Sequence, residues 1–366
     1  MDPQVLGTAG TPSLQVPERW EDVTPEWMTE AIAGHHPGAR VGDVELVLRD
    51  DGTNRRARFA LTYAAGSGPA SAFLKAESDA PGRRKIHARN GNLFNEPKLF
   101  ASGIALPIEH PRAYAAVVDE VNLDYVIVME DLLSRGADPR DATRPLTVDE
   151  VSRGLLGLAR LHSRYWGKVG SEAALSWVQP FTPSRGWLKP MEVGVPMGLE
   201  QAGDGVPEDI RRRPVEEILH IWTSYVRSLT TGPQTLLHGD PHIGNTYVLP
   251  DGGIGFLDWQ VVRSGSWVHD VGYFIVSSLT EPDRRHHERE LVEIYRTSLD
   301  LSEEERPTAE EAWLRYRATP AHGLPIWLIT LLSDVHAQER TSALIRRYAA
   351  AFVELDTPSA VEQIGR

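Results

Sequence analysis

Residues 236–259, LLHGDPHIGNTYVLPDGGIGFLDW, constrain the fold of this chain more than any other segment. Residues 247–249 and 254–257 are apolar runs that indicate two short strands. Between them, Pro250-Asp251-Gly252-Gly253 is strong turn chemistry, because glycine tolerates positive φ and proline sets the entry into the turn. The segment therefore predicts a β-hairpin, and a hairpin of this length would fold Asp258 back beside Asn245.

Three polar side chains around the predicted hairpin indicate chemistry. Asn245 and Asp258 would bring one amide oxygen and one carboxylate to a point where a hard cation such as Mg²⁺ could bind. Asp240 and Asn245 are five residues apart, which is the spacing of the catalytic-loop Asp and Asn in protein kinases. Asp240 is therefore the candidate catalytic residue, placed to orient a hydroxyl nucleophile or to accept its proton.

The motifs HGDPHIGN and LDW, with VMEDL at 128–132 and LARLHSRYWG at 158–167, resemble the aminoglycoside phosphotransferase and choline kinase family. The resemblance extends from about residue 45 to 275 and is strongest to the ecdysteroid-kinase-like subgroup. It implies an α+β, bilobal protein-kinase-like fold, with an antiparallel sheet and helices in the first lobe and a larger, mostly helical second lobe. We place the boundary near Asp131, so residues 1–130 would bind the nucleotide. Residues 131–366 would hold the catalytic loop, the metal site and the acceptor pocket.

Composition excludes several other classes of protein. The net charge of −13 argues against a nucleic-acid binder or a protein of anionic membrane surfaces. The chain has no cysteine, which excludes disulfides, thiol catalysis and zinc–thiolate sites. The N-terminus lacks the pattern of a secretory signal, and the most apolar run, 324–332, is too short to span a membrane. We therefore expect a cytoplasmic protein; nothing in the sequence indicates its oligomeric state.

The region from residue 44 to 76 has the pattern of three strands. Residues 44–48 and 57–63 flank a glycine-containing turn at 49–54, and residues 72–76 follow. The resemblance places the phosphate-covering loop of kinases at this turn and makes Thr53 and Asn54 candidate nucleotide contacts. Because the turn has a single glycine, an ordinary hairpin explains it as well.

Lys75 is the lysine that the resemblance assigns to the α- and β-phosphates of the nucleotide. It is the only lysine in an apolar, strand-like context, whereas Lys85 lies in a basic loop. Its partner would be Glu96, the sole acid of a helix expected at 88–100. Because Pro97 disfavours helical geometry at the residue before it, that helix could instead begin near Glu96, with Asn95 as its N-cap.

The segment after the strand at 125–129 is the second expected nucleotide contact. By composition it is only a buried strand that runs into a loop, but the resemblance makes it the linker between lobes. Glu130 and Leu132 would then offer backbone groups to the adenine edge.

Further on, Thr147 and Glu150 form a capping box, and the helix that follows carries His162 on its apolar face. We interpret His162 as a hydrogen-bonded core residue and not as a ligand.

The rest of the second lobe gives fewer signals. Residues 171–205 interleave aromatic residues with proline and glycine, which is the pattern of an irregular lid or of a loop that covers a secondary core. Helical patterns follow at 206–230 and again across 281–355. In the resembled fold, His238 would support the catalytic loop and Asp270 would brace it through backbone amides. His242 has no required role there and would pack or touch the substrate.

The sequence thus predicts a kinase that uses ATP, or GTP, with Mg²⁺ to phosphorylate a hydroxyl of a small molecule. Gly239 replaces the arginine of a phosphorylation-controlled protein kinase, and no Ala-Pro-Glu segment follows. The resembled family accepts aminoglycosides, choline, macrolides, sugars and steroid-like alcohols. The acidic charge of the second lobe favours a cationic acceptor, whereas the aromatic residues of the 171–205 stretch favour an apolar acceptor. The two clues conflict.

Two other classes of function remain open. A catalytically silent nucleotide-binding scaffold would keep the fold without turnover, although all the candidate catalytic residues are present. A metallophosphoesterase is suggested by the Gly-Asp-Pro-His run that begins at Gly239. That class needs a glycine after the histidine, where this chain has Ile243, and its other ligand clusters are absent from the sequence.

Overall fold

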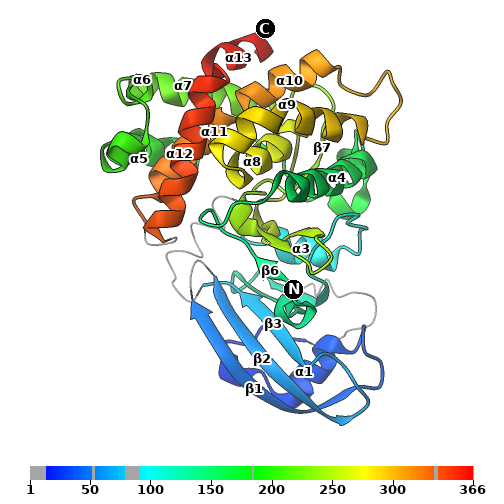
Figure 1. Ribbon diagram of the computed structural model, residues 1–366. Helices are drawn as coiled ribbons and strands as arrows, with labels where there is room; N and C mark the ends of the chain where they lie inside the picture. Colours follow the sequence, from blue (N-terminus) through cyan, green and yellow to red (C-terminus); the bar gives the residue numbers. More distant parts are fainter. Residues whose placement is uncertain (1–13, 52–53, 79–90, 184, 334–336, 366) are drawn as a thin grey trace. The chain divides into compact units, whose positions relative to one another are not determined.

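A computed structural model describes residues 14–51, 54–78, 91–183, 185–333 and 337–365 (Figure 1). The chain divides into two compact units. The smaller contains residues up to 105, 110–137 and 258–261, and the larger contains 106–109, 138–257 and the residues from 262 onward. The short segments 106–109 and 258–261 therefore belong to a different unit from their chain neighbours. The functional division at residue 130 into a nucleotide-binding lobe and a catalytic lobe remains a prediction.

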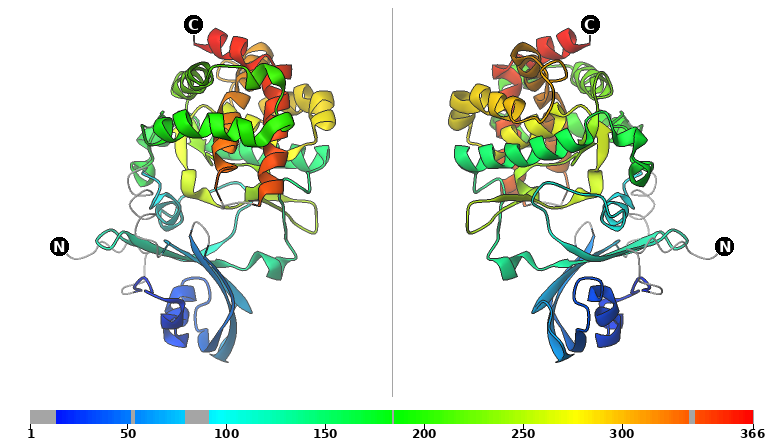
Figure 2. Two further views of the ribbon diagram at one scale, coloured as in Figure 1. Left: turned by 90° about the vertical axis from the view of Figure 1, so that its left-hand side faces the viewer. Right: turned by 90° about the vertical axis from the view of Figure 1, so that its right-hand side faces the viewer.

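The smaller unit is built on one five-stranded antiparallel sheet, seen from two further sides in Figure 2. The strands occur in the order β1-β2-β3-β5-β4, and their bounds are Arg40–Asp51 (β1), Arg55–Ala65 (β2), Ser71–Ala76 (β3), Ala113–Asp119 (β4) and Asp124–Glu130 (β5). The α+β class and the strands expected at 44–48, 57–63, 72–76 and 125–129 are confirmed. Strand β4 was not predicted, because its alanine-rich sequence has little β propensity and depends on pairing with β5.

Both faces of this sheet are covered, which explains why β5 is apolar at consecutive positions. Val126 and Val128 belong to a core with Met28 of helix α1 (Pro25–Ile32). Ile127 and Met129 alternate with these two valines along the strand. They belong to a second core, against which the partly buried Phe100 of α3 (Asn95–Ala101) packs. Successive side chains of a strand point to opposite faces, so α1 and α3 cover opposite faces of the sheet.

Helix α3 is shorter than the helix expected at 88–100. It begins at Asn95, and residues 91–94 before it are not helical, so the longer helix is wrong over those positions; residues 88–90 lie outside the described part. The start near Glu96 is nearly right, but Phe94 is the N-cap, without a side-chain cap. Pro97 therefore lies in the first turn. An N–H group there would have no acceptor within the helix, so the proline, which lacks this group, costs no helical hydrogen bond.

The larger unit is mainly helical, with two small sheets. Its long helices are α4 (Val148–Tyr165), α5 (Arg185–Ala202), α7 (Val215–Ser228), α8 (Val268–Ser278), α9 (Glu281–Thr297), α10 (Ala309–Ala318), α11 (Pro320–Thr330) and α12 (Gln338–Glu354), and the shorter helices are α6 (Glu208–Arg211) and α13 (Thr357–Ile364). The strands are β6 (Asp138–Pro139), β7 (Thr235–Leu237), β8 (Thr246–Val248), β9 (Ile254–Phe256) and β10 (Arg263–Gly265). None of these helices combines the length and apolarity that crossing a membrane requires.

The hairpin of the central segment is confirmed. Strands β8 and β9 pair antiparallel, and the Leu249 N–H donates to the Gly253 carbonyl across the turn at 2.8 Å. Gly252 adopts φ 80°, the left-handed conformation that glycine tolerates best. The capping box that opens α4 is confirmed as well, because the Thr147 hydroxyl accepts from the Glu150 N–H and the Glu150 carboxylate accepts from the Thr147 N–H.

The prediction of an irregular region at 171–205 is wrong from 185 to 202, where α5 forms a helix with Pro190 and Pro196 in its interior. The reason is packing against α11. A side chain at Gly194 would approach Ile329 to 2.8 Å, and one at Gly198 would overlap the Leu328 carbonyl, so the glycines let the two helices lie close together. Burial of this face outweighs the low helix propensity of proline and glycine.

Glycine also sets the packing between α11 and α12. A Cβ on Gly323 would overlap the ring of Tyr348, whose hydroxyl donates to the Tyr273 carbonyl of α8 at 2.9 Å. Gly323→Ala should therefore lower the free energy of unfolding by about 1–3 kcal/mol, the usual penalty of overpacking a core. Denaturant unfolding of the purified variant measures this. Gly170→Ala, in the same unit with open space around its Cβ position, should unfold like the parent, and equal losses for both would refute the packing argument.

Candidate active site

Lys75 lies at the centre of a buried ion cluster in the smaller unit. Leu74 and Ala76 of β3 pack in the core with α1, so Lys75 between them points to the side of α3. Its ammonium lies 2.5 Å from Oε2 of Glu96 and 2.8 Å from Oδ1 of Asp258. The contact predicted between Lys75 and Glu96 is thus present, and Asp258 is a second partner that the sequence did not indicate.

Burial and the neighbouring charges shift the pKa values of this cluster. Burial by itself lowers the pKa of Lys75, but the negative charges of Asp258 and Glu96 outweigh it and raise the pKa above that of an ordinary lysine. Burial raises the pKa of the Glu96 carboxyl, while the charge of Lys75 opposes that shift. Lys75 therefore stays protonated at neutral pH, which a phosphate-binding group requires.

Asp258 is fixed by its backbone as well as by Lys75. Its φ of 64° is in the left-handed region, which is uncommon for residues other than glycine and is tolerated by aspartate. The next residues are tied to α3, because the Trp259 N–H donates to Glu96 and the Asn95 amide donates to the Gln260 carbonyl. The metal-ligand candidate Asp258 thus has one defined orientation within the smaller unit.

The other nucleotide-contact candidates are only partly described. Thr53 lies outside the described residues, and Asn54 is buried directly before β2. The Glu130 N–H donates to the Arg112 carbonyl, and its carboxylate binds Arg135 at 3.0 Å. The Leu132 carbonyl accepts from the N–H of Ala137. The roles of Thr53 and Asn54 at the nucleotide phosphates and of Glu130 and Leu132 at the adenine edge remain predictions.

In the larger unit, a buried carboxylate fixes the HGD segment. Asp270 accepts from the N–H groups of His238 at 2.7 Å and Gly239 at 3.0 Å, and from Nε2 of His162 at 3.2 Å. Burial by itself raises the pKa of Asp270, but the hydrogen bond from His162 holds the pKa below its usual value. Gly239 adopts φ 85°, the left-handed conformation that glycine tolerates best.

For two histidines of this network, one tautomer of the neutral ring fits the hydrogen bonds. His162 Nε2 donates to Asp270, so its Nδ1 accepts from the Tyr295 hydroxyl at 2.7 Å. His162 is therefore the hydrogen-bonded core residue that was predicted. His238 Nδ1 accepts from the Asp240 N–H at 3.3 Å, and Nε2 then donates to the Leu257 carbonyl at 3.1 Å. His238 thus links the start of the loop to the end of the hairpin.

Asp240 and Asn245 face each other across the loop. The Asn245 amide nitrogen donates to the Asp240 carbonyl at 2.9 Å and lies 3.3 Å from its Oδ2. Because the nitrogen is used in this way, the amide oxygen of Asn245 is the atom suited to a hard cation. Its predicted partner, Asp258, belongs to the smaller unit, so the shared site remains a prediction. No cluster of three or more His, Cys, Asp or Glu suited to a metal occurs in the described part of the chain.

Sequence reasoning missed two residues that support the loop. His269 Nε2 donates to the Gly239 carbonyl at 3.0 Å, and the Tyr225 hydroxyl lies 3.4 Å from its Nδ1. Ser277 accepts from the Ile243 N–H at 3.1 Å. His269 directly precedes Asp270, so the same turn of α8 bonds both sides of Gly239. That adjacency was the available signal, but which face of the helix His269 occupies depends on packing.

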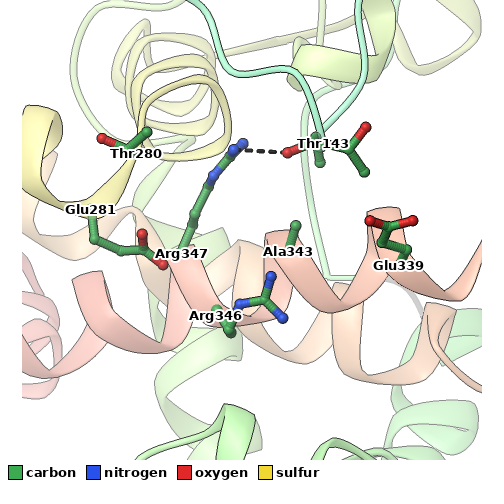
Figure 3. Close-up of a pocket in the computed structure, with 8 residues that line it drawn as sticks. Thr143, Thr280, Glu281, Glu339, Ala343, Arg346 and Arg347 are labelled. Atoms are coloured by element: carbon green, nitrogen blue, oxygen red, sulfur yellow. Dashed lines mark hydrogen bonds between the residues drawn. The ribbon is translucent and has the colours of Figure 1, made fainter.

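A pocket of about 260 Å³ lies elsewhere in the larger unit (Figure 3). Its charged lining consists of Arg346 and Arg347 of α12 with Glu281 and Glu339, two charges of each sign. The Arg347 guanidinium donates to the Ala142 carbonyl at 2.8 Å and also to the Ser277 carbonyl. Arg347 therefore braces the end of α8, and none of the predicted site residues lines this pocket.

A model of the ecdysteroid kinase-like family matches residues 208–305, the segment with the HGD loop, the hairpin and Asp270. The resemblance inferred from those motifs is confirmed there. No curated protein sequence matches the chain significantly.

Solved structures of small-molecule kinases are similar to most of the chain. A choline kinase from Streptococcus pneumoniae is 13% identical over 90% of this chain and 98% of that one, with a TM-score of 0.44. An ethanolamine kinase from Plasmodium vivax is 13% identical, with 87% and 82% covered and a TM-score of 0.49. A macrolide 2′-phosphotransferase from Brachybacterium faecium is 16% identical, with 86% and 95% covered and a TM-score of 0.42.

Asp270→Asn should lower the free energy of unfolding by about 2–4 kcal/mol, because the amide would turn an N–H towards one of three buried donors. Since the pKa of Asp270 is lowered by folding, its stabilising contribution is fully present above about pH 4, near the pKa of an unfolded aspartate, and is lost as the pH falls through the folded value. The difference between parent and variant, measured by denaturant unfolding, should therefore shrink below about pH 4.

The exposed Asp209 provides the matched control, because Asp209→Asn also replaces a carboxylate by an amide, but at an exposed position. That variant should unfold within about 0.5 kcal/mol of the parent. A difference between parent and Asp270→Asn that grows towards low pH would contradict the assigned ionisation.

Proposed function

We propose that this protein is an ATP-dependent kinase that transfers the γ-phosphoryl group to a hydroxyl of a small molecule. The observation that carries the proposal is the fixed loop in which Asp240 faces Asn245. Phosphoryl transfer asks a protein mainly for positioning and charge neutralisation, and this loop supplies a carboxylate and an amide in one defined relation.

In the proposed reaction, the ion cluster of the smaller unit serves the nucleotide. Lys75 would bind the nucleotide phosphates, and Glu96 would hold its ammonium in one rotamer and keep it charged. Thr53, Asn54, Glu130 and Leu132 are the proposed further contacts of ATP or GTP. This assignment is supported by the burial of Lys75, since a charged donor is strengthened by a local environment of low dielectric constant.

Asp240 would orient the acceptor hydroxyl and receive its proton as the oxygen attacks the γ-phosphorus. Asn245 and Asp258 are the proposed Mg²⁺ ligands, and an amide oxygen with a carboxylate is a donor set that fits this ion. When bound, Mg²⁺ would neutralise phosphate charge. His238, His269 and Asp270 would keep the loop in place through its backbone, without touching the reacting atoms.

The first test is consumption of Mg²⁺-ATP by the purified protein with a panel of aminoglycosides, amino alcohols, macrolides, sugars and sterols. We expect ADP formation that depends on one class of acceptor, and a loss of at least ~100-fold in kcat for Asp240→Asn, as removal of a general base produces. Asp209→Asn serves again as the control and should keep full activity.

The other outcomes separate the alternatives. Tight nucleotide binding without any acceptor-dependent turnover, equal in parent and variant, would favour the silent scaffold. Release of phosphate from phosphate esters without nucleotide would favour the phosphoesterase. The identity of the phosphorylated compound would decide between a cationic and an apolar acceptor.

Lys75 is tested by nucleotide binding. Lys75→Met should abolish most of the thermal stabilisation that the parent gains from Mg²⁺ and a non-hydrolysable ATP analogue, because the variant lacks the charge for the phosphates. Removal of Lys75 also leaves Glu96 and Asp258 without their shared cation, so the free variant should melt below the parent. Lys168→Met, at an exposed position, should respond to the analogue like the parent. Full stabilisation of Lys75→Met would reject the phosphate role.

A further inference from the structure

His242 is the one candidate site residue to which the proposed reaction assigns no task, yet its ring is held firmly. It caps the short helical turn Ile243–Asn245, where its Nδ1 accepts from the Gly244 N–H at 3.0 Å. In the neutral imidazole only one ring nitrogen accepts, so the proton is on Nε2. Nε2 lies 3.8 Å from Oδ2 of Asp240.

The surroundings leave the ring of His242 little freedom. It is buried, and the rings of Trp327 and Tyr273 meet it edge-on, with centroids at 4.9 Å and 6.3 Å. On the side of Gly244 there is no room either, since a Cβ there would lie 2.7 Å from Cε1 of His242. The direction of Nε2 is therefore set by α8, by α11 and by the loop itself.

We propose that His242 is a positioning residue that orients the Asp240 carboxylate through its Nε2–H; this inference rests on the proposed kinase function. The Asn245 amide reaches the same Oδ2 at 3.3 Å, so two donors on different residues define the rotation of the carboxylate. The distance of 3.8 Å is longer than a hydrogen bond. Catalytic hydrogen bonds are often long without substrate and tighten when it binds.

Two substitutions separate this role from the capping role of the same side chain. His242→Asn keeps an acceptor at the position of Nδ1, and asparagine is a favourable cap, but it has no donor that reaches Asp240. His242→Gln places an amide nitrogen near the position of Nε2 and loses the cap. Asn therefore preserves the local fold and removes the orienting donor, whereas Gln does the reverse.

The measurement is steady-state kinetics with Mg²⁺-ATP and the panel compound that the parent phosphorylates fastest, and with water alone as the acceptor. For His242→Asn we expect kcat to fall on the order of 10–100-fold, because a misplaced catalytic group lowers the rate by up to about 10²-fold. KM for ATP and for the acceptor should stay within about twofold of the parent values, since the interactions that bind the ground state and the transition state equally are unchanged. His242→Gln should recover most of kcat despite a lower melting temperature.

A second readout does not depend on turnover. The ring nitrogens of the parent, labelled with ¹⁵N-histidine and assigned through the signals missing from His242→Asn, should show His242 protonated at Nε2. Asp240→Asn should shift that Nε2 resonance. An Nε2 without a proton, or one unaffected by Asp240→Asn, would overturn the inference.

The outcomes distinguish this inference from the function on which it rests. An active parent with His242→Asn at full kcat would refute the positioning role and leave the kinase intact. Loss of activity in both variants in step with their melting temperatures would assign His242 to the cap alone. An inactive parent would refute the kinase, and the nitrogen resonances would then decide whether His242 orients Asp240.

Discussion

The geometry of the candidate catalytic loop depends on one buried carboxylate. Asp270 receives the N–H groups of two consecutive residues, His238 and Gly239, and the left-handed conformation of Gly239 directs the chain that follows towards Asp240. An ionised carboxylate at this depth would be strongly destabilised without those donors, and the donors would be unsatisfied without it. The loop and α8 therefore hold each other, and Asp240 extends from a backbone that has one conformation.

The smaller unit has a corresponding centre in Lys75. The alternation of β3 directs this lysine towards α3, where two carboxylates compensate the burial of its charge. One of them, Asp258, comes from a segment distant in the chain and has a left-handed backbone of its own. Both centres follow the same principle, since each buries an ion whose partners come from other elements and so fixes those elements.

Local sequence patterns predicted the elements whose signals are local. The β8–β9 hairpin follows from its turn residues, and the start of α4 follows from its capping box. The errors have a common physical cause. Strand β4 is alanine-rich and α5 contains proline and glycine, so both form only because a neighbouring element buries one of their faces.

Loop spacing and turn chemistry indicated Asp240, Asn245 and Asp258 as groups of the candidate site, because both are local properties, and the resemblance to kinases added Lys75. Tertiary packing fixed how these groups are held. It paired Asp258 with Lys75, aimed His269 at Gly239 and turned Nε2 of His242 towards Asp240. Such contacts join residues whose relative placement comes from packing, and burial and tautomers depend on that packing.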